Sequence, residues 1–105
     1  MKITIQSLDF TSKQGLKDFV REKVNKLARF YSEIIGSEIC LRLVNSNKNA
    51  NKVCQIRLVI PGNDLLACAQ CQTFEEAAIQ AVEAIERQIK KLKTKMIRNR
   101  KMLLK

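Results

Sequence analysis

Residues 73–95 read TFEEAAIQAVEAIERQIKKLKTK, a pattern typical of one long amphipathic helix. Thr73 is followed three residues later by Glu76, the capping-box spacing that satisfies free N–H groups at a helix start. Apolar residues then recur every three or four positions and share one face. They are Phe74, Ala77, Ala78, Ala81, Val82, Ile85, Ile89, Leu92 and Met96. At about 1.5 Å per residue the helix would span about 35 Å, so we expect its far end to project beyond a sheet of short strands.

The chain before this helix alternates between apolar and polar residues, as half-buried strands do. The predicted strands are residues 2–7, 38–44, 54–60 and 65–72. The polar segment at 45–52 is a hairpin loop, and Pro61-Gly62-Asn63-Asp64 is a turn. The side chains expected to face the core are Ile3, Ile5, Ile39, Leu41, Leu43, Cys54, Ile56, Leu58, Ile60, Leu65, Ala67 and Ala69.

A shorter helix is predicted between the first two strands, capped by Thr11 or Ser12 and ending near Gly36. Its apolar face is Leu16, Phe19, Val20, Val24, Leu27, Phe30 and Tyr31. A right-handed crossover makes the first two strands parallel, and the hairpins make the other pairs antiparallel. Because each strand has one apolar side, both helices pack on the same face and leave the other face open.

The predicted fold class is therefore α+β, a single β-α-β-β-β-α domain with a four-stranded mixed sheet and two helices on one face. The domain spans residues 1–95. Residues 96–105 form a basic tail that either extends the last helix or frays.

Composition restricts the function. The 105 residues include 20 Lys and Arg, 10 Asp and Glu, and no His, a formal net charge of +10. Without His there is no Ser-His or Cys-His nucleophile pair, so we expect no enzyme, no catalytic residue and no cofactor. No apolar run approaches the roughly 20 residues that cross a bilayer, and no signal peptide is apparent, which predicts a cytoplasmic protein without membrane contact. The charge favours a nucleic-acid partner; a merely well-solvated basic protein is the alternative.

The positive charge is concentrated near the end of the chain. Residues 1–85 hold 11 basic and 9 acidic residues, whereas residues 86–105 hold 9 basic and 1 acidic residue. Helical spacing aligns Arg87, Lys91, Lys95 and Arg98 in one stripe, with Lys90 and Lys101 on the adjoining flank. The first helix adds Lys23, Lys26 and Arg29.

Lys23 falls within the apolar arc of its helix. Its stem must therefore run out to water or to a ligand between the two helices. Two interpretations stay open: a phosphate contact, or a lysine that only covers its apolar neighbours.

The four cysteines, Cys40, Cys54, Cys68 and Cys71, raise the question of zinc or redox chemistry because the last two form a CxxC motif. Within a strand, positions 68 and 71 point to opposite faces, whereas metal and redox CxxC sites lie at turns or helix starts. We expect no metal site, and interpret the cysteines as buried small hydrophobes and exposed free thiols.

Three segments together with this element order carry a family resemblance: Lys23-x-x-Lys26-Leu27, Leu65-x-Ala67-x-Ala69 and Ile85-Glu86-Arg87-Gln88-Ile89-x-Lys91. Over about residues 2–95 the chain resembles the ribosome hibernation-promoting factor and ribosome-associated inhibitor family, also called sigma-54 modulation proteins. The tail is basic, Glu75 stands where many members have Tyr, and the chain looks like a short form.

The resemblance implies a layout similar to double-stranded RNA-binding domains and a monomer when free. It implies binding to the small ribosomal subunit in the channel for mRNA and for tRNA in the A and P sites, which blocks translation under stress or in stationary phase. No small-molecule substrate is implied. By position, the expected rRNA contacts are Lys23, Lys26, Arg87, Lys90, Lys91 and Lys95. Two alternatives are a general double-stranded RNA-binding module and a protein that modulates a transcription factor.

Overall fold

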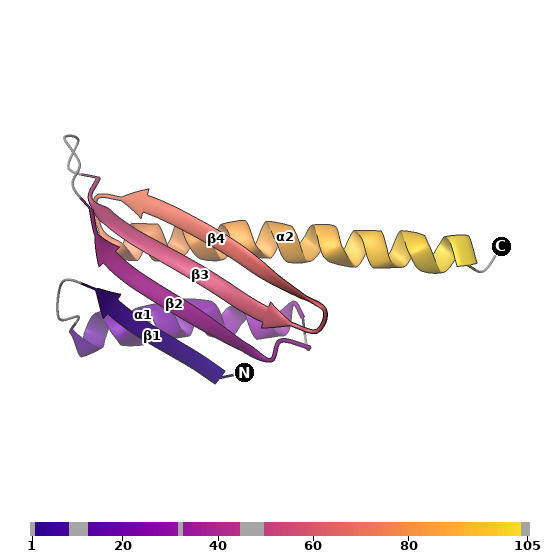
Figure 1. Cartoon of the computed structure of the whole chain (residues 1–105), viewed down its shortest axis with the longest axis horizontal. Coiled ribbons are helices and arrows are strands. Elements are labelled where there is room, and N and C mark those ends of the chain that lie inside the picture. Colours follow the sequence, from indigo (N-terminus) through magenta and orange to yellow (C-terminus); the bar gives the residue numbers. More distant parts are fainter. Residues whose placement is uncertain (1, 9–12, 32, 45–49, 104–105) are drawn as a thin grey trace.

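The computed structural model describes the backbone of residues 2–8, 13–31, 33–44 and 50–103, and the side chains of these ranges except Leu8, Asn63 and residues 94–103. Its elements follow the predicted order (Figure 1). They are β1 (Lys2–Leu8), α1 (Gln14–Asn25), the 3-10 helix η1 (Lys26–Arg29), β2 (Gly36–Leu43), β3 (Lys52–Ile60), β4 (Asn63–Cys71) and α2 (Phe74–Leu103).

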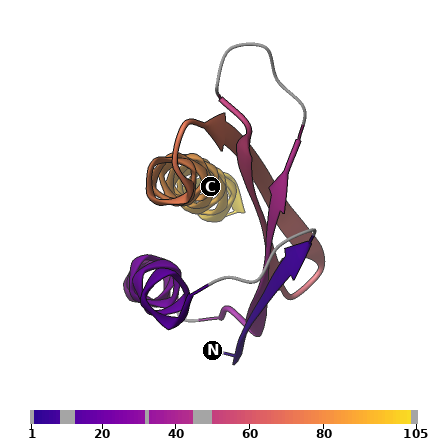
Figure 2. The same ribbon diagram turned by 90° about the vertical axis from the view of Figure 1, so that its left-hand side faces the viewer.

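The sheet has the strand order β1-β2-β3-β4. β1 pairs with β2 in parallel, and the β2–β3 and β3–β4 pairs are antiparallel. Both helices cover the same face and leave the other open (Figure 2). The predicted α+β fold and its topology are confirmed.

The core lies between the helices and this face. Ile39 and Leu41 of β2 and Ile56 and Leu58 of β3 are buried, as their alternation predicts. Small side chains on α2 let the helix lie close above β3 and β4; the fully buried ones are Ala77, Ala78 and Ala81. Leu43, expected on the core face, is 37% exposed because it is the last residue of β2.

The first helix differs from its prediction at its described ends. The residue before its first turn is Lys13, whose backbone is extended and whose side chain makes no capping bond; Thr11 and Ser12 lie outside the described residues. The α-helix ends at Asn25, tightens into η1 and stops at Arg29, so the predicted end near Gly36 is wrong. Gly36 instead begins β2 opposite Lys2, where an added Cβ would lie 3.1 Å from the Lys2 carbonyl oxygen. The chain must leave the helix early to reach that position.

The turn between β3 and β4 is tighter than predicted. Only Pro61 and Gly62 lie outside the strands, and Gly62 has φ 81°, a conformation that glycine adopts without steric cost. β4 therefore begins at Asn63, two residues before its predicted start.

α2 begins and projects as predicted. The Glu76 N–H donates to Thr73 Oγ1 at 3.2 Å. With 30 residues the helix is about 45 Å long and continues past the edge of the sheet (Figure 1). The molecule measures 55 × 28 × 18 Å as a result.

Ser37 is a buried polar residue in this core. Its side chain is 2% exposed, and its Oγ has no hydrogen-bond partner among the described residues. Because an unpartnered buried hydroxyl costs about 1–3 kcal/mol, we expect Ser37→Ala to raise the free energy of unfolding by about 1 kcal/mol in urea titrations. Unchanged or lower stability of this variant would show that the hydroxyl is satisfied.

Candidate nucleic-acid interface

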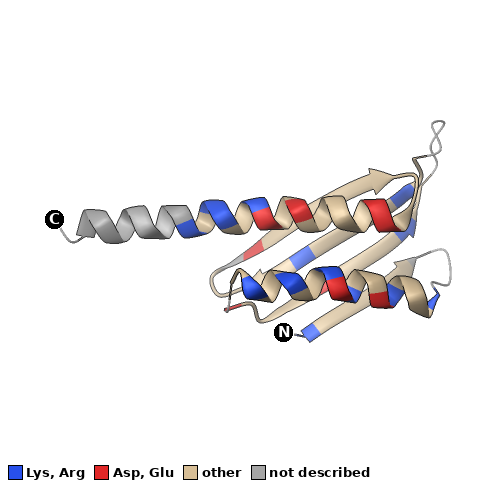
Figure 3. Cartoon of the chain, turned by 180° about the vertical axis from the view of Figure 1, so that it is seen from behind, with Lys and Arg blue, Asp and Glu red and all other residues tan. Residues whose placement is uncertain are grey.

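Basic residues of two helices lie near one end of the sheet. α1 and α2 both start at the end of the sheet where β1 and β4 finish, and both run toward the opposite end (Figure 1). The last part of the first helix therefore lies level with the middle of α2, and the blue bands of the two helices lie near the same level along the molecule (Figure 3). We call this region the basic end. Its residues are Lys23, Lys26, Arg29, Arg87, Lys90, Lys91 and Lys93.

Most of these charges are accessible and not neutralised within the protein. All except Lys23 are exposed. Within the described part of the chain, no ion pair joins Lys26, Arg29, Arg87 or Lys91 to a carboxylate. Positive charges held this close repel one another, so an added polyanion stabilises them.

Lys23 is the half-buried member of the basic end. Its Nζ lies 5.3 Å from the centroid of the Phe19 ring, a cation–π contact within the same helix. Lys23 therefore covers an apolar neighbour, which is one of the two interpretations offered for it from the sequence.

Gln88 fixes how α2 is turned relative to the sheet. Its Nε2 donates to the Leu66 carbonyl oxygen at 2.7 Å, on the edge strand β4. Helical spacing places Lys91 on this flank, and it places Lys90 and Lys93 on the flank toward α1. The cations of α2 therefore surround the exposed half of the helix.

Sequence reasoning assigned Gln88 no role. The available signal was its position, because a polar residue interrupts the apolar arc there as Lys23 does on the first helix. Its partner could not be inferred, since Leu66 is 22 residues away in the chain.

Lys95 was also a predicted contact. The backbone of α2 continues through this position to Leu103, and the side chains of Lys95, Met96, Arg98 and Lys101 lie outside the described residues.

The outer face of α1 is mixed in charge rather than basic. A shallow hollow there is lined by Asp18, Arg21, Glu22, Asn25, Lys26 and Arg29. Asp18 accepts a hydrogen bond from Gln14 at 2.9 Å and lies 3.9 Å from the Arg21 guanidinium. The carboxylates come about one to three turns before Lys26 and Arg29. The helix is therefore most basic at its C-terminal end, where cations are also stabilised by the helix dipole.

The cysteines lie on both faces of the sheet, as predicted for the CxxC pair. Cys68 is exposed on the open face, whereas Cys54 and Cys71 are buried in the core. Across the residues described, no group of three or more Cys, Asp or Glu side chains is placed to hold a metal ion. Burial raises the pKa of the Cys54 thiol from its ordinary value of 9.0 to about 12.

This pKa predicts a loss of stability at high pH. Between pH 9 and about 12 the unfolded thiol has lost its proton while the folded one keeps it, so the unfolded state is favoured as pH rises. The free energy of unfolding should fall by up to about 1.4 kcal/mol per pH unit from this group. Urea titrations at about pH 8 and pH 10 should show a smaller pH-dependent loss in Cys54→Val than in the unaltered protein. Equal losses would contradict the prediction.

None of the helices in the described ranges is both long enough and apolar enough to cross a bilayer.

The sequence matches the family described as sigma 54 modulation protein / S30EA ribosomal protein over residues 3–97. The chain belongs to this family. The S30EA match runs from β1 into the projecting part of α2, so it contains every residue of the basic end.

A curated relative, the ribosome hibernation promotion factor of Deinococcus radiodurans, is 28% identical over 89 residues. The alignment covers 83% of this chain and 46% of that protein. The chain therefore spans about half the length of this curated relative.

Two solved structures have the same fold as this chain. A ribosomal subunit interface protein from Coxiella burnetii has a TM-score of 0.79 at 18% identity, covering 90% of this chain and 99% of its own. The N-terminal domain of Thermus thermophilus Protein Y has a TM-score of 0.76 at 19% identity, covering 88% and 99% respectively.

Proposed function

We propose that this protein binds the small ribosomal subunit in the channel for mRNA and tRNA and blocks translation under stress or in stationary phase. The observation that carries the proposal is the basic end, where exposed cations of two helices lie level with one another and where, among the described residues, Lys26, Arg29, Arg87 and Lys91 form no ion pair with a carboxylate. Membership of the S30EA family and the name of the Deinococcus relative support it. In this proposal the protein acts in the cytoplasm.

The proposed mechanism is electrostatic and steric. Lys26, Arg87, Lys90 and Lys91 neutralise rRNA phosphates, and Lys23 and Lys95 add further contacts. The bound domain then occupies space that mRNA and tRNA need. No covalent bond forms or breaks, so the protein acts as a binding factor rather than as an enzyme.

Recognition of the RNA backbone fits the side chains better than recognition of bases. Phe19, Phe30 and Phe74 pack against the core, which removes them as stacking platforms for unpaired bases. Cations on a rigid helix instead bind phosphates with weak dependence on sequence. The rigidity comes from Ile85 and Ile89, which are 0% and 1% exposed under the basic part of α2.

The ribosome-binding unit in this proposal is residues 1–95, a monomer when free, and the basic tail of residues 96–105 adds further positive charge.

Fractionation of a stationary-phase lysate on a sucrose gradient tests the proposal. We expect the protein in fractions that contain small subunits, and we expect ribonuclease treatment to release it. Protein confined to the top of the gradient would contradict ribosome binding. Retention on an acidic protein partner after ribonuclease would favour the transcription-factor modulator.

The element order and the helices on one face also fit a general double-stranded RNA-binding module. A competition assay separates the two functions. Excess free duplex should leave the protein on small subunits if the ribosome is the specific target, and should remove it if any duplex suffices.

A further inference from the structure

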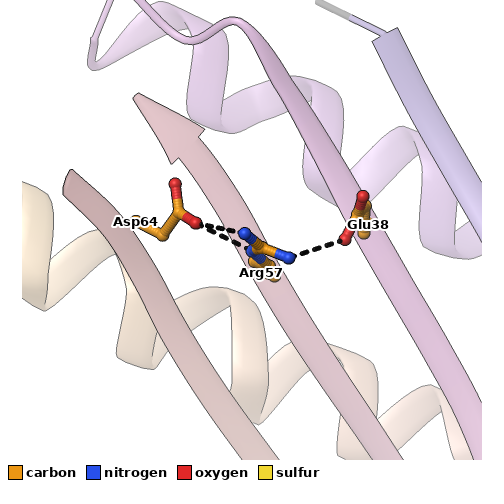
Figure 4. Close-up of polar contacts among 3 residues, drawn as sticks. All are labelled: Glu38, Arg57 and Asp64. Atoms are coloured by element: carbon orange, nitrogen blue, oxygen red, sulfur yellow. Dashed lines mark hydrogen bonds and ion pairs between the residues drawn. The ribbon is translucent and has the colours of Figure 1, made fainter. Parts of the chain in front are cut away.

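The open face of the sheet carries a charged group of its own, on the side away from the basic end. Arg57 of β3 lies between Glu38 of β2 and Asp64 of β4 (Figure 4). Its Nε and Nη2 donate to Asp64 Oδ2 at 2.8 and 2.6 Å, and its Nη1 lies 3.5 Å from Glu38 Oε2. One guanidinium is therefore shared by two carboxylates on neighbouring strands.

Strand register builds this group. Glu38 stands directly opposite Arg57, and Asp64 stands opposite Val59, two residues along the same face. Such direct and diagonal cross-strand neighbours are within reach of long side chains. The group is about half exposed, and exposed ion pairs contribute little to stability. Its consequence is the loss of a free cation from this face.

Without the two carboxylates this face would suit RNA. A hollow of about 330 Å³ on this face is lined by Arg57 and Glu38 themselves and by side chains that are mostly uncharged. They include Thr4, Gln6, Gln55 and Leu66. Amides, a hydroxyl and a guanidinium around a hollow are groups that bind phosphate, ribose and bases.

We infer that Glu38 and Asp64 are specificity-determining residues, which hold Arg57 and close the open sheet face to RNA. The inference rests on the proposed function, because a domain in an RNA-walled channel meets RNA on several sides. A second cationic face would allow it to bind in the wrong orientation. Holding Arg57 lowers the positive charge of this face, on which Lys2 and Arg42 remain exposed, and so favours docking through the basic end.

A double-mutant cycle tests the inference, with labelled oligouridylate as the probe between about 50 and 200 mM salt. Arg57→Gln alone should leave affinity within about twofold, because the guanidinium is already occupied. Glu38→Gln with Asp64→Asn should tighten binding about fivefold at the lower salt. The slope of the logarithm of affinity against the logarithm of salt concentration should become steeper by about 0.7, the value for one additional phosphate contact on a single strand. Adding Arg57→Gln to that pair should remove the gain. Asp64→Asn alone removes one of the two negative charges that hold Arg57 and should show part of the gain.

The control makes the same charge change elsewhere, by Glu75→Gln with Glu83→Gln on α2. If this control pair also binds oligouridylate more tightly, the increase should be the same with and without Arg57→Gln. The inference is overturned if the Glu38 and Asp64 pair gives no gain, if the gain survives Arg57→Gln, or if the control pair shows the same dependence on Arg57.

The cycle is then repeated with Arg87→Glu and Lys91→Glu, which separates this inference from the proposed function. The Arg57-dependent gain should persist in that background, because it arises on the other face; its disappearance would overturn the inference. The proposed function is tested separately, by the binding of the Arg87→Glu, Lys91→Glu variant to small subunits. Loss of binding supports that function, and retained binding contradicts it.

Discussion

Arg87→Glu, Lys91→Glu and Lys95→Glu combined should abolish cosedimentation with small ribosomal subunits and leave the fold intact. Each hydrogen bond to a charged phosphate contributes about 1.5 kcal/mol or more, so the loss of three lowers affinity by at least about a thousandfold. Repulsion by the new carboxylates adds to the loss. Arg87 and Lys91 are exposed, so the circular dichroism spectrum and melting temperature should stay close to those of the unaltered protein.

A matched pair of double variants controls for net charge. Arg87→Glu with Lys91→Glu is compared with Lys2→Glu and Arg42→Glu, which reverse two exposed cations on the sheet. We expect strong loss of binding in the first pair and a small loss in the second. Equal losses would mean that total charge, and not the basic end, determines binding.

The second large effect is expected from Ile85→Ala, beneath the basic part of α2. Ile85 is 0% exposed in the core cluster, so the truncation leaves a cavity and should lower the free energy of unfolding by about 3 kcal/mol. For a domain of this size the melting temperature should fall by roughly 10 °C or more. Calorimetry or urea titration measures both quantities.

Ile79→Ala is the matched control, because it makes the same truncation on the same helix. Ile79 is 38% exposed, so we expect a loss below about 1 kcal/mol. Similar losses for the two variants would contradict the packing of α2 described above.

Much of the fold could be predicted because periodicity reports burial directly. The apolar face of α2 and the alternation of β3 follow from the residues alone, and they determine which side of each element is covered. The end of the first helix could not be predicted, because Phe30 and Tyr31 continue its apolar spacing although the chain has already turned toward Gly36. Tertiary packing holds them against the core although they lie outside the helix.

The candidate site also has some features that the sequence predicts and others that it does not. Clustering of Lys90 and Lys91 on an exposed helix was predictable, since it depends only on local spacing. The contacts of Gln88 with Leu66, and of Arg57 with Glu38 and Asp64, depend on strand register and on how α2 lies over β4. Patterns within one element do not specify those relations.

Binding of fluorescently labelled mRNA and initiator tRNA to purified small subunits tests the central claim most directly. If the protein occupies their channel through its basic end, saturating amounts should prevent both from binding, and excess mRNA and tRNA should displace the protein in return. Simultaneous binding of protein, mRNA and tRNA to one small subunit would contradict the account.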